Sequence, residues 1–468
     1  MTLAVMNITA VVSLRGLATE AIYGPASAFY YLFAAVVFLI PTAMIAAELA
    51  AMFSNKQGGV FRWVGEAFGA RVGFLAIWLQ WIQSTIWYPT VLTFGAVSIA
   101  FIGSNPVADA SLASNRMFTL CVVLAIYWAA TFISLKGLGW VGKISKWGGI
   151  IGTIIPAALL IVLAVVYFLK GGHSNLNMHQ SFFPDLTHLD NIVLASSIFL
   201  FYAGMEMMGI HVMDVDNPKR NYPRAIIIGS LATVLIFILG TFSLGIIVPA
   251  KEISLTQTLL IGFDRYFSFL GMPWMGSVVA VALVFGVLAC VLTWVSGPSK
   301  GIFAVGRAGY LPPFFQKQNS AGVQRNILLV QGGIVTLLGL LFVVMPSVQS
   351  FYQILSQLTV LLYLIMYMLM FAAAIALRYK LPSVDRPFRL GRRGNGLMWI
   401  LGGLGFAGSL LAFVLSFIPP SQISVGSTTV WFAVLIIGAV IFVGIPFIIY
   451  AMRKPSWRAE NSDFEPFG

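Results

Sequence analysis

The chain has 468 residues, of which 59% are hydrophobic and only 9% are charged, and its formal net charge is +12. A soluble domain carries about 25% charged residues, so this composition excludes a soluble protein and indicates an integral membrane protein. Its two cysteines, Cys121 and Cys290, lie in apolar runs and predict neither a disulfide nor a metal framework.

Windows of about 20 apolar residues predict twelve membrane-spanning helices in an all-α polytopic fold. In chain order the expected spans are residues 3–24, 27–52, 70–102, 115–135, 146–170, 189–212, 223–247, 275–307, 326–345, 350–378, 397–418 and 428–452. Two hydrophilic loops between them, NKQGGVFRWVGEAFGAR and DVDNPKRNYPRA, mix aromatic and charged residues, which favours short interfacial helices.

The basic residues predict the orientation of these spans. If the N-terminus is cytoplasmic, 22 of the 27 Lys and Arg residues face the cytoplasm. This asymmetry is the positive-inside rule, and it predicts that both termini are cytoplasmic. It also accounts for the net charge without a nucleic-acid partner. The exceptions are four outer residues and one within a span: Arg116, Lys170, Lys251, Arg265 and, within the span, Arg15.

Two predicted spans carry glycines beside charged residues. The first contains SLRGLATE, with Arg15, Gly16 and Glu20, and the sixth contains FYAGMEMMG, with Gly204 and Glu206. A charge inside the bilayer costs from about 2.5 to more than 10 kcal/mol, so such residues indicate function. We interpret both spans as discontinuous helices, whose freed N–H and C=O groups suit the carboxylate and ammonium of an amino acid.

The third and eighth spans are both over-long, at comparable positions after the first and sixth. This pattern predicts five helices repeated as 1–5 and 6–10, with two added. We therefore expect one transmembrane domain over residues 1–452 and a short cytoplasmic tail, 453–468. Within the domain, repeat one covers about 3–170, repeat two about 189–378, and the additional helices about 397–452.

Several motifs resemble the amino acid–polyamine–organocation superfamily. NPKRNYPRA (217–225) and GPSKGIFAVGRAGYLPPFF (297–315) are similar to superfamily signatures after helices 6 and 8. Four further motifs resemble, more specifically, the bacterial glutamate/GABA antiporter group. They are QGGVFRW (57–63), SFFPDLT (181–187), VPAKEISL (248–255) and FIPPSQI (417–423).

This resemblance implies a five-plus-five inverted-repeat transporter in the bacterial inner membrane. The implied activity is exchange of glutamate, or a related amino acid, for GABA or another decarboxylation product, without cofactor or metal. A proton-coupled symporter is the alternative mechanism. A passive channel is less favoured. An intramembrane enzyme is also less favoured, since only Arg15, Glu20 and Glu206 could supply catalytic groups at bilayer depth and they suit binding better. The partners expected are amino-acid substrates and lipid, and a homodimer stays an open alternative to a monomer.

Candidate substrate contacts come from the predicted helix breaks and from the family resemblance. Around the first break they are Arg15, Gly16 and Leu17. The resemblance adds residues of helices 6, 8 and 10: Tyr202, Gly204, Glu206, Trp294, Tyr363 and Tyr367. The alternative interpretation of the aromatic residues is packing or an interfacial belt.

Three features depart from the best-known member of the group. Cys290 stands where that member has an acidic residue, the first helix reads SLRGLATE, and the tail is too short to plug a pore. The substrate and any gating by pH are therefore not fixed by the resemblance.

The charged candidates each have two interpretations. Arg15 could bind a substrate carboxylate as a planar fork, or pair with Glu206 or Glu20. Glu206 could steady the helix 6 break or carry a proton, and Glu20 could be proton-coupling or structural. Glu48 is expected to support a gate or loop. The four histidines, His173, His179, His188 and His211, are expected to be solvated and not to bind a metal.

Overall fold

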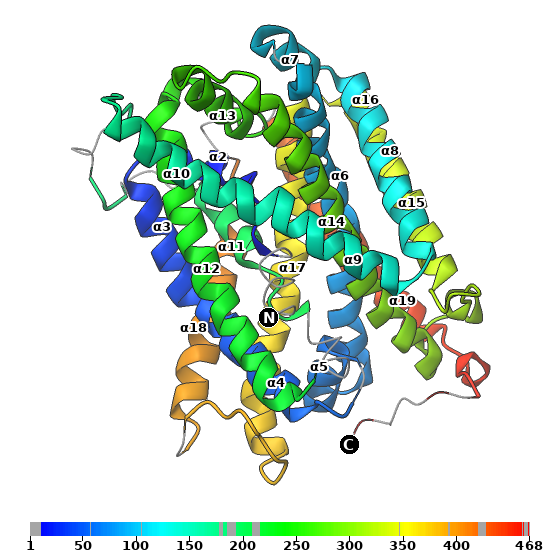
Figure 1. Ribbon diagram of the computed structural model, residues 1–468. Helices are drawn as coiled ribbons and strands as arrows, with labels where there is room; N and C mark the ends of the chain where they lie inside the picture. Colours follow the sequence, from blue (N-terminus) through cyan, green and yellow to red (C-terminus); the bar gives the residue numbers. More distant parts are fainter. Residues whose placement is uncertain are drawn as a thin grey trace.

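The computed structural model describes residues 11–56, 58–103, 105–176, 181–184, 193–207, 216–345, 347–391, 394–419, 427–460, 462 and 467 (Figure 1). All regular secondary structure in these ranges is helical. The first half of the chain forms α2 (Gly16–Ala21), α3 (Ala26–Ala34), η1 (Ala35–Leu39), α4 (Ile40–Met52), α5 (Val60–Phe68), α6 (Ala70–Ala100), η2 (Phe101–Gly103), α7 (Pro106–Ala113), α8 (Arg116–Leu135), α9 (Leu138–Gly149), η3 (Ile150–Ile154) and α10 (Ile155–Leu169).

The second half continues the bundle. It forms η5 (Val193–Ser196), α11 (Ser197–Tyr202), α12 (Pro218–Ile247), η7 (Ala250–Glu252), α13 (Thr258–Phe269), α14 (Met275–Val305), η8 (Gly306–Tyr310), η9 (Pro313–Gln316), α15 (Arg325–Gly339), α16 (Leu341–Val344), α17 (Val348–Lys380), α18 (Gly396–Leu415), α19 (Thr428–Ala451) and η10 (Pro455–Trp457).

Nine helices among the described residues are long and apolar enough to cross a membrane. They confirm an all-helical, multi-pass membrane protein, but the count is lower than the twelve expected from the sequence. The remaining predicted spans correspond to shorter helices, namely α2, α11 and the pair α15 and α16. Two of these three are the spans for which the sequence predicts a break, and a broken helix falls below the length of a spanning one.

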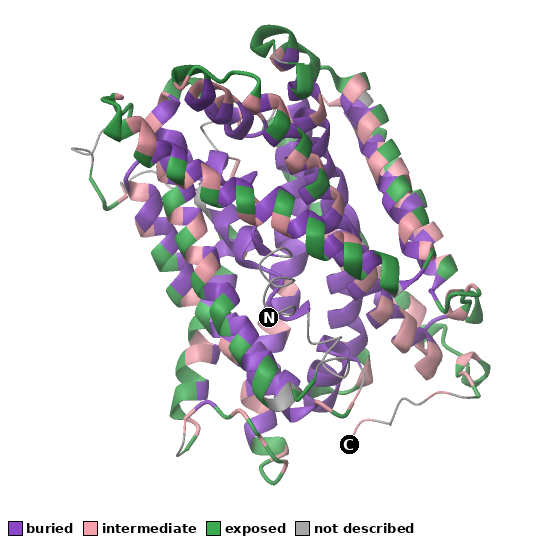
Figure 2. Cartoon of the chain, viewed as in Figure 1, coloured by how far each residue is buried: buried purple, intermediate pink, exposed green. Residues whose placement is uncertain are grey.

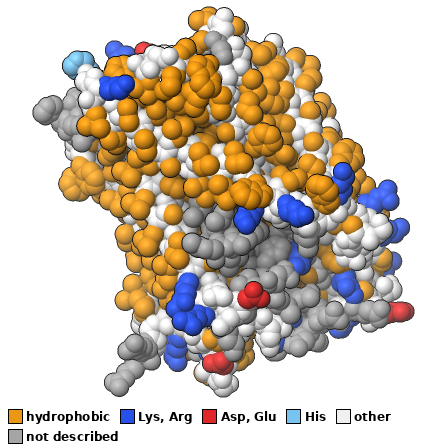
Figure 3. Space-filling view, in the orientation of Figure 1, with side chains coloured by type: hydrophobic (Ala, Val, Ile, Leu, Met, Phe, Trp, Pro, Cys, Tyr) orange, Lys and Arg blue, Asp and Glu red, His pale blue; other side chains and the backbone are white. Residues whose placement is uncertain are grey.

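The helices α6, α14 and α17 form the centre of the bundle, since α6 packs against both of the others. Figure 2 shows that buried residues concentrate on these inner helices, whereas peripheral helices alternate between buried and exposed faces. From Val430 onward the exposed positions of α19 are apolar, including Val440 and Ile437. An apolar exposed face is what lipid requires, and Figure 3 shows a broad hydrophobic band on the molecular surface.

The two ends of the bundle differ. One, here called the α7 end, carries α7 and α13, and the other, here called the α5 end, carries α5, the 381–391 loop and the C-terminal segment (Figure 1). On the face seen in Figure 3, most Lys and Arg side chains lie below the hydrophobic band, toward the α5 end.

Two predicted span boundaries and one predicted loop differ from the structure. The fifth span starts at Leu138 and not at 146, and the seventh starts at Pro218 and not at 223. Pro218 occupies the first helical turn, where its missing N–H costs no hydrogen bond, so the basic NPKRNYPRA segment enters α12 and forms no separate interfacial helix.

The first loop does contain the expected short helix, α5, but nearly all of that helix is buried. It turns back at Gly69, whose φ of 88° favours glycine, and packs against α6. A Cβ on Gly73 would lie 2.9 Å from the Gly65 Cα, so two glycines allow this close approach. The helix is therefore an internal support at the α5 end and not a surface helix.

Of the histidines, His173 is exposed in the segment after α10. The other three, His179, His188 and His211, lie outside the described residues.

Candidate functional site

The described backbone is non-helical at both positions where the sequence predicts an interruption, and these two segments are here called the interruptions. Val12 and Ser13 have no regular structure before α2 begins at Gly16. In the second interruption, α11 ends at Tyr202 and the backbone becomes extended, with Gly204 at a φ of 112°. A Cβ at Gly204 would also lie 2.9 Å from the Trp294 ring. Glycine is therefore required there by both conformation and space.

Glu206 lies directly after the second interruption and is fully buried. Its Oε1 accepts hydrogen bonds from Gln80 Nε2 at 3.0 Å and from the Tyr363 hydroxyl at 2.5 Å. Its Oε2 accepts a hydrogen bond from the Tyr367 hydroxyl, and that hydroxyl in turn accepts one from the Gly204 N–H at 2.8 Å. The carboxylate therefore connects the unwound segment to α6 and α17 through three donors.

Arg15 is only 2% exposed. Its Nε donates to Ser13 Oγ at 3.0 Å and one terminal nitrogen donates to Thr90 Oγ1 at 2.7 Å. The guanidinium lies between two aromatic rings, 5.5 Å from the Trp87 centroid and 5.3 Å from the Tyr352 centroid. These two hydrogen bonds to described residues use two of the five N–H donors of the guanidinium.

Among the described residues, no ion pair includes Arg15. Its partner Thr90 and the Glu206 partner Gln80 are ten residues apart on α6. At a rise of 1.5 Å per residue this places the two contacts about 15 Å apart along the helix. The alternative of an Arg15–Glu206 pair is therefore not formed in this conformation. Glu20 instead accepts a hydrogen bond from Ser197 Oγ at 2.9 Å.

A small cavity lies between the two interruptions. Its volume is about 20 Å³, which holds about one water molecule. The Trp294 ring, in contact with the rings of Trp87 and Tyr363, forms part of its wall. The cavity is thus closed to an amino acid in this conformation. Its lining residues are Val11, Ser13, Arg15, Gln83, Trp87, Leu200, Phe201, Ala203, Trp294 and Tyr363.

A larger cavity, of about 280 Å³, lies at the α5 end beside the last turns of α14, with Lys300 and Arg307 in its wall. No residue of either interruption lines it. We therefore centre the candidate site on the smaller cavity, where a buried cation without a carboxylate partner among the described residues meets unwound backbone.

The remaining predicted site residues surround the interruptions without lining this cavity. Leu17 faces α12, since a Cβ on Gly240 would lie 2.8 Å from its side chain. Gly16 packs against the ring of Phe201. The Tyr202 hydroxyl donates to the Tyr31 carbonyl at 3.3 Å and thus points toward α3.

Comparisons with known proteins show the family to which the chain belongs. The sequence profile described as amino acid permease matches residues 1–442. The chain belongs to the amino acid permease family. This family is part of the amino acid–polyamine–organocation superfamily that the sequence motifs resemble.

The permease is similar to three relatives over nearly its whole length. An uncharacterised transporter of Legionella pneumophila is 37% identical over 95% of both chains. A glutamate/gamma-aminobutyrate antiporter of Lactococcus lactis is 33% identical over 94% of this chain and 86% of its own. A probable agmatine/putrescine antiporter of the same species is 25% identical over 91% and 88%, respectively.

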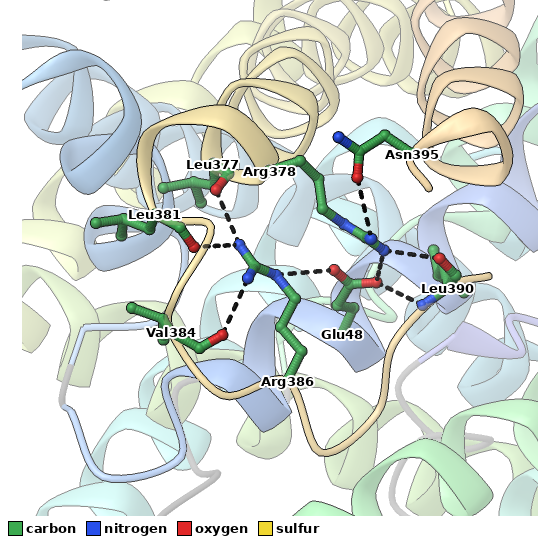
Figure 4. A network of polar contacts seen from close by, with 8 residues as sticks. All are labelled: Glu48, Leu377, Arg378, Leu381, Val384, Arg386, Leu390 and Asn395. Carbon is green, nitrogen blue, oxygen red and sulfur yellow. Dashed lines mark hydrogen bonds and ion pairs between the residues drawn. The ribbon is translucent and has the colours of Figure 1, made fainter. Parts of the chain in front are cut away.

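Away from the cavity, Glu48 organises the α5 end of the permease (Figure 4). Its Oε2 accepts hydrogen bonds from Arg378 at 2.6 Å and from the Leu390 N–H at 2.7 Å, and its Oε1 lies 3.5 Å from Arg386 Nε. Burial lowers the pKa of the Arg386 guanidinium, and the Glu48 charge offsets part of that effect. Glu48 thus holds the end of α17 and the following loop against α4, which agrees with the loop-supporting role expected from the sequence.

Sequence reasoning missed several residues of the site, all on α6 and α17. They are Gln80, Gln83, Trp87, Thr90 and Tyr352. A signal for four of them existed, because WLQWIQSTIWYPT places amides and hydroxyls inside an otherwise apolar span. Their pairing with Arg15 and Glu206 required the packing of α6 against both interruptions.

The Glu206 contacts make a prediction about stability. Tyr367→Phe removes a hydroxyl that both donates to Glu206 and accepts from Gly204, and it leaves a buried N–H without a partner. We expect it to cost about 1–3 kcal/mol, measured as a lower unfolding temperature of the purified permease in detergent.

Tyr363→Phe is the matched control, because Oε1 retains the Gln80 donor after that change. Its effect should be smaller. Equal unfolding temperatures for the two variants would show that the Gly204 contact does not stabilise the interruption.

Proposed function

We propose that the protein is a secondary active antiporter that exchanges glutamate, or a related amino acid, for GABA or another decarboxylation product by alternating access. The observation that carries the proposal is Arg15, a buried guanidinium that lines the cavity between the two interruptions and makes no ion pair among the described residues. The name of the lactococcal glutamate/gamma-aminobutyrate antiporter supports the same substrate class. The name of the probable agmatine/putrescine antiporter supports exchange as the mode of transport.

The proposed recognition follows from charge and hydrogen bonding. Arg15 receives the side-chain carboxylate of glutamate, or the carboxylate of a ω-amino acid, through two parallel N–H donors. The aromatic rings of Trp87 and Tyr352 keep the guanidinium planar and oriented. The substrate ammonium binds the backbone carbonyl of Ala203, a residue that lines the cavity. No cofactor, nucleotide or metal takes part.

Glu206 is proposed to hold the second interruption in place. Its three hydrogen-bond donors stabilise a carboxylate at this position without a cation. The competing mechanism is proton-coupled symport, in which a buried carboxyl group carries a proton with the substrate.

The architecture proposed for this activity has twelve spans, with five-helix inverted repeats over about 3–170 and 189–378 and two additional helices over about 397–452. The two interruptions support it, since each lies in the first span of a proposed repeat. The α5 end with its basic residues is placed in the cytoplasm of the bacterial cell, and both termini are cytoplasmic.

Vesicle assays test exchange against symport. Radiolabelled glutamate uptake should be at least about tenfold faster into liposomes preloaded with GABA or glutamate than into empty ones, because return of the empty carrier is the slow step. Empty liposomes that fill as fast as preloaded ones would contradict exchange. Stimulation by an imposed proton gradient in empty liposomes would establish symport instead.

Arg15 variants test the recognition of the side-chain carboxylate. Arg15→Lys keeps the charge and loses the fork, so glutamate uptake should fall by about 10- to 100-fold, in line with 1.5–3 kcal/mol for a hydrogen bond to a charged group. Glutamine uptake should fall much less. Competition among glutamate, glutamine and GABA measures the difference.

Thr90→Val is the control, since it removes an Arg15 contact and leaves the guanidinium in place. It should produce a smaller loss of the same selectivity. Equal losses for all three substrates in Arg15→Lys would mean that Arg15 supports the fold and not the substrate.

Cysteine labelling tests the orientation. In a Cys121→Ser, Cys290→Ala background, Ser174→Cys should react with an impermeant maleimide added to intact cells, whereas Asn55→Cys should react only after the membrane is opened. Both introduced positions are exposed. The reverse pattern would invert the proposed topology.

A further inference from the structure

Glu20 is a buried carboxyl group that the proposed exchange does not use. It lies in α2, is completely inaccessible, and accepts one hydrogen bond, from Ser197 at the start of α11. Its other oxygen, Oε2, is buried and has no hydrogen-bond partner among the described residues. The hydroxyls of Thr19 and Ser196, next to these two residues in the chain, are also buried without a partner there.

The nearest titratable side chains do not donate to Glu20. Tyr31 and Tyr202 interact with it electrostatically. The Tyr31 hydroxyl, however, is hydrogen-bonded to Thr241 at 2.9 Å, and the Tyr202 hydroxyl donates to the Tyr31 carbonyl. Both hydroxyls are therefore engaged elsewhere.

No cation compensates Glu20 within the described part of the chain. None of the ion pairs among the described residues includes Glu20. The elements packed against α2 include η5, α11, α12 and α13, and η5 and α11 contain no charged residue. The Lys and Arg residues of α12 end at Arg224, seventeen residues before Thr241, a separation of about 25 Å along the helix.

On α13 the charged residues are Asp264 and Arg265. Arg265 forms an ion pair with Glu252. Burial and the neighbouring Asp109 raise the pKa of Asp264 to about 6. Asp264 is therefore an ionisable group at the α7 end that titrates near neutral pH, and any test of Glu20 must separate the two.

An ionised carboxylate in this environment would be costly. Burying an unpaired charge costs several kcal/mol, whereas a neutral carboxyl with one unsatisfied oxygen costs about 1–3 kcal/mol. The described surroundings of Glu20, which supply one neutral donor and no cation, match the protonated form.

We propose that Glu20 is a proton-binding site, separate from the substrate cavity, that joins α2 to α11 when it is protonated. The proposal adds a coupled proton to the amino-acid transport proposed above. The role of Glu20 in coupling rests on that proposed function. Loss of the proton places an unpaired charge between α2, α11 and α12, so it favours a conformation in which water from the α7 end reaches the carboxylate. Proton binding thus shifts the population toward the closed arrangement.

Infrared titration of the purified full-length protein tests the site directly. The wild type should show the carbonyl band of a protonated carboxylic acid that disappears as pH rises, and Glu20→Gln should lose that band. Glu206→Gln and Asp264→Asn, measured in the same way, should retain it. Because this readout needs no transport, it decides the proton site even if amino-acid exchange is not found.

Proton movement in liposomes tests the coupling. In liposomes preloaded with GABA and a pH-sensitive dye, the acidification that accompanies glutamate exchange should fall at least tenfold in Glu20→Gln and persist in Asp264→Asn. An unchanged infrared band in Glu20→Gln would overturn the proposal. A Glu20 band that responds to sodium and not to acid would also overturn it, by assigning the site to a metal cation.

Discussion

The structure around the interruptions depends on how a low-dielectric interior treats three buried charged or ionisable groups, Arg15, Glu20 and Glu206. An unpaired buried charge is costly, so each such group needs hydrogen-bond donors, a counter-charge, a ligand or a proton. Glu206 has three donors from α6 and α17. Arg15 has two hydroxyl acceptors and two aromatic rings but no carboxylate among the described residues. This difference is the basis for proposing a structural role for Glu206 and a ligand-binding role for Arg15.

The two interruptions provide the second element of the site. Unwound backbone exposes polar groups that a membrane interior does not tolerate unless they line a cavity or find partners. At Gly204 one such N–H is satisfied by Tyr367, and the absent side chain makes room for Trp294. The cavity between the interruptions has room for about one water molecule, so binding an amino acid requires the surrounding helices to separate. The same movement would give each side of the membrane access to the cavity in turn.

The ends of the bundle are held by different interactions. At the α5 end, Glu48 lies between two arginines with both oxygens engaged, and removing one partner of such a buried pair costs about 3–5 kcal/mol. We expect α4, the end of α17 and the loop after it to move as one unit. At the α7 end, Glu20 on α2 accepts a hydrogen bond from the neutral hydroxyl of Ser197 on α11, without an ion pair among the described residues. That contact is weaker, so it is the more suitable place for a change of conformation.

The sequence by itself determined the membrane class, most span boundaries and both interruptions, because long apolar runs and glycine beside charge are local properties of the chain. Its motifs also indicated the family. It left open whether Arg15 pairs with Glu206, because that depends on where two distant segments meet α6. The tertiary structure places their contacts about 15 Å apart along that helix. It also turned Leu17 and Tyr202 away from the cavity and brought Gln80, Thr90 and Tyr352 to the buried charges, since the face that each helix presents is set by packing and not by spacing along the chain.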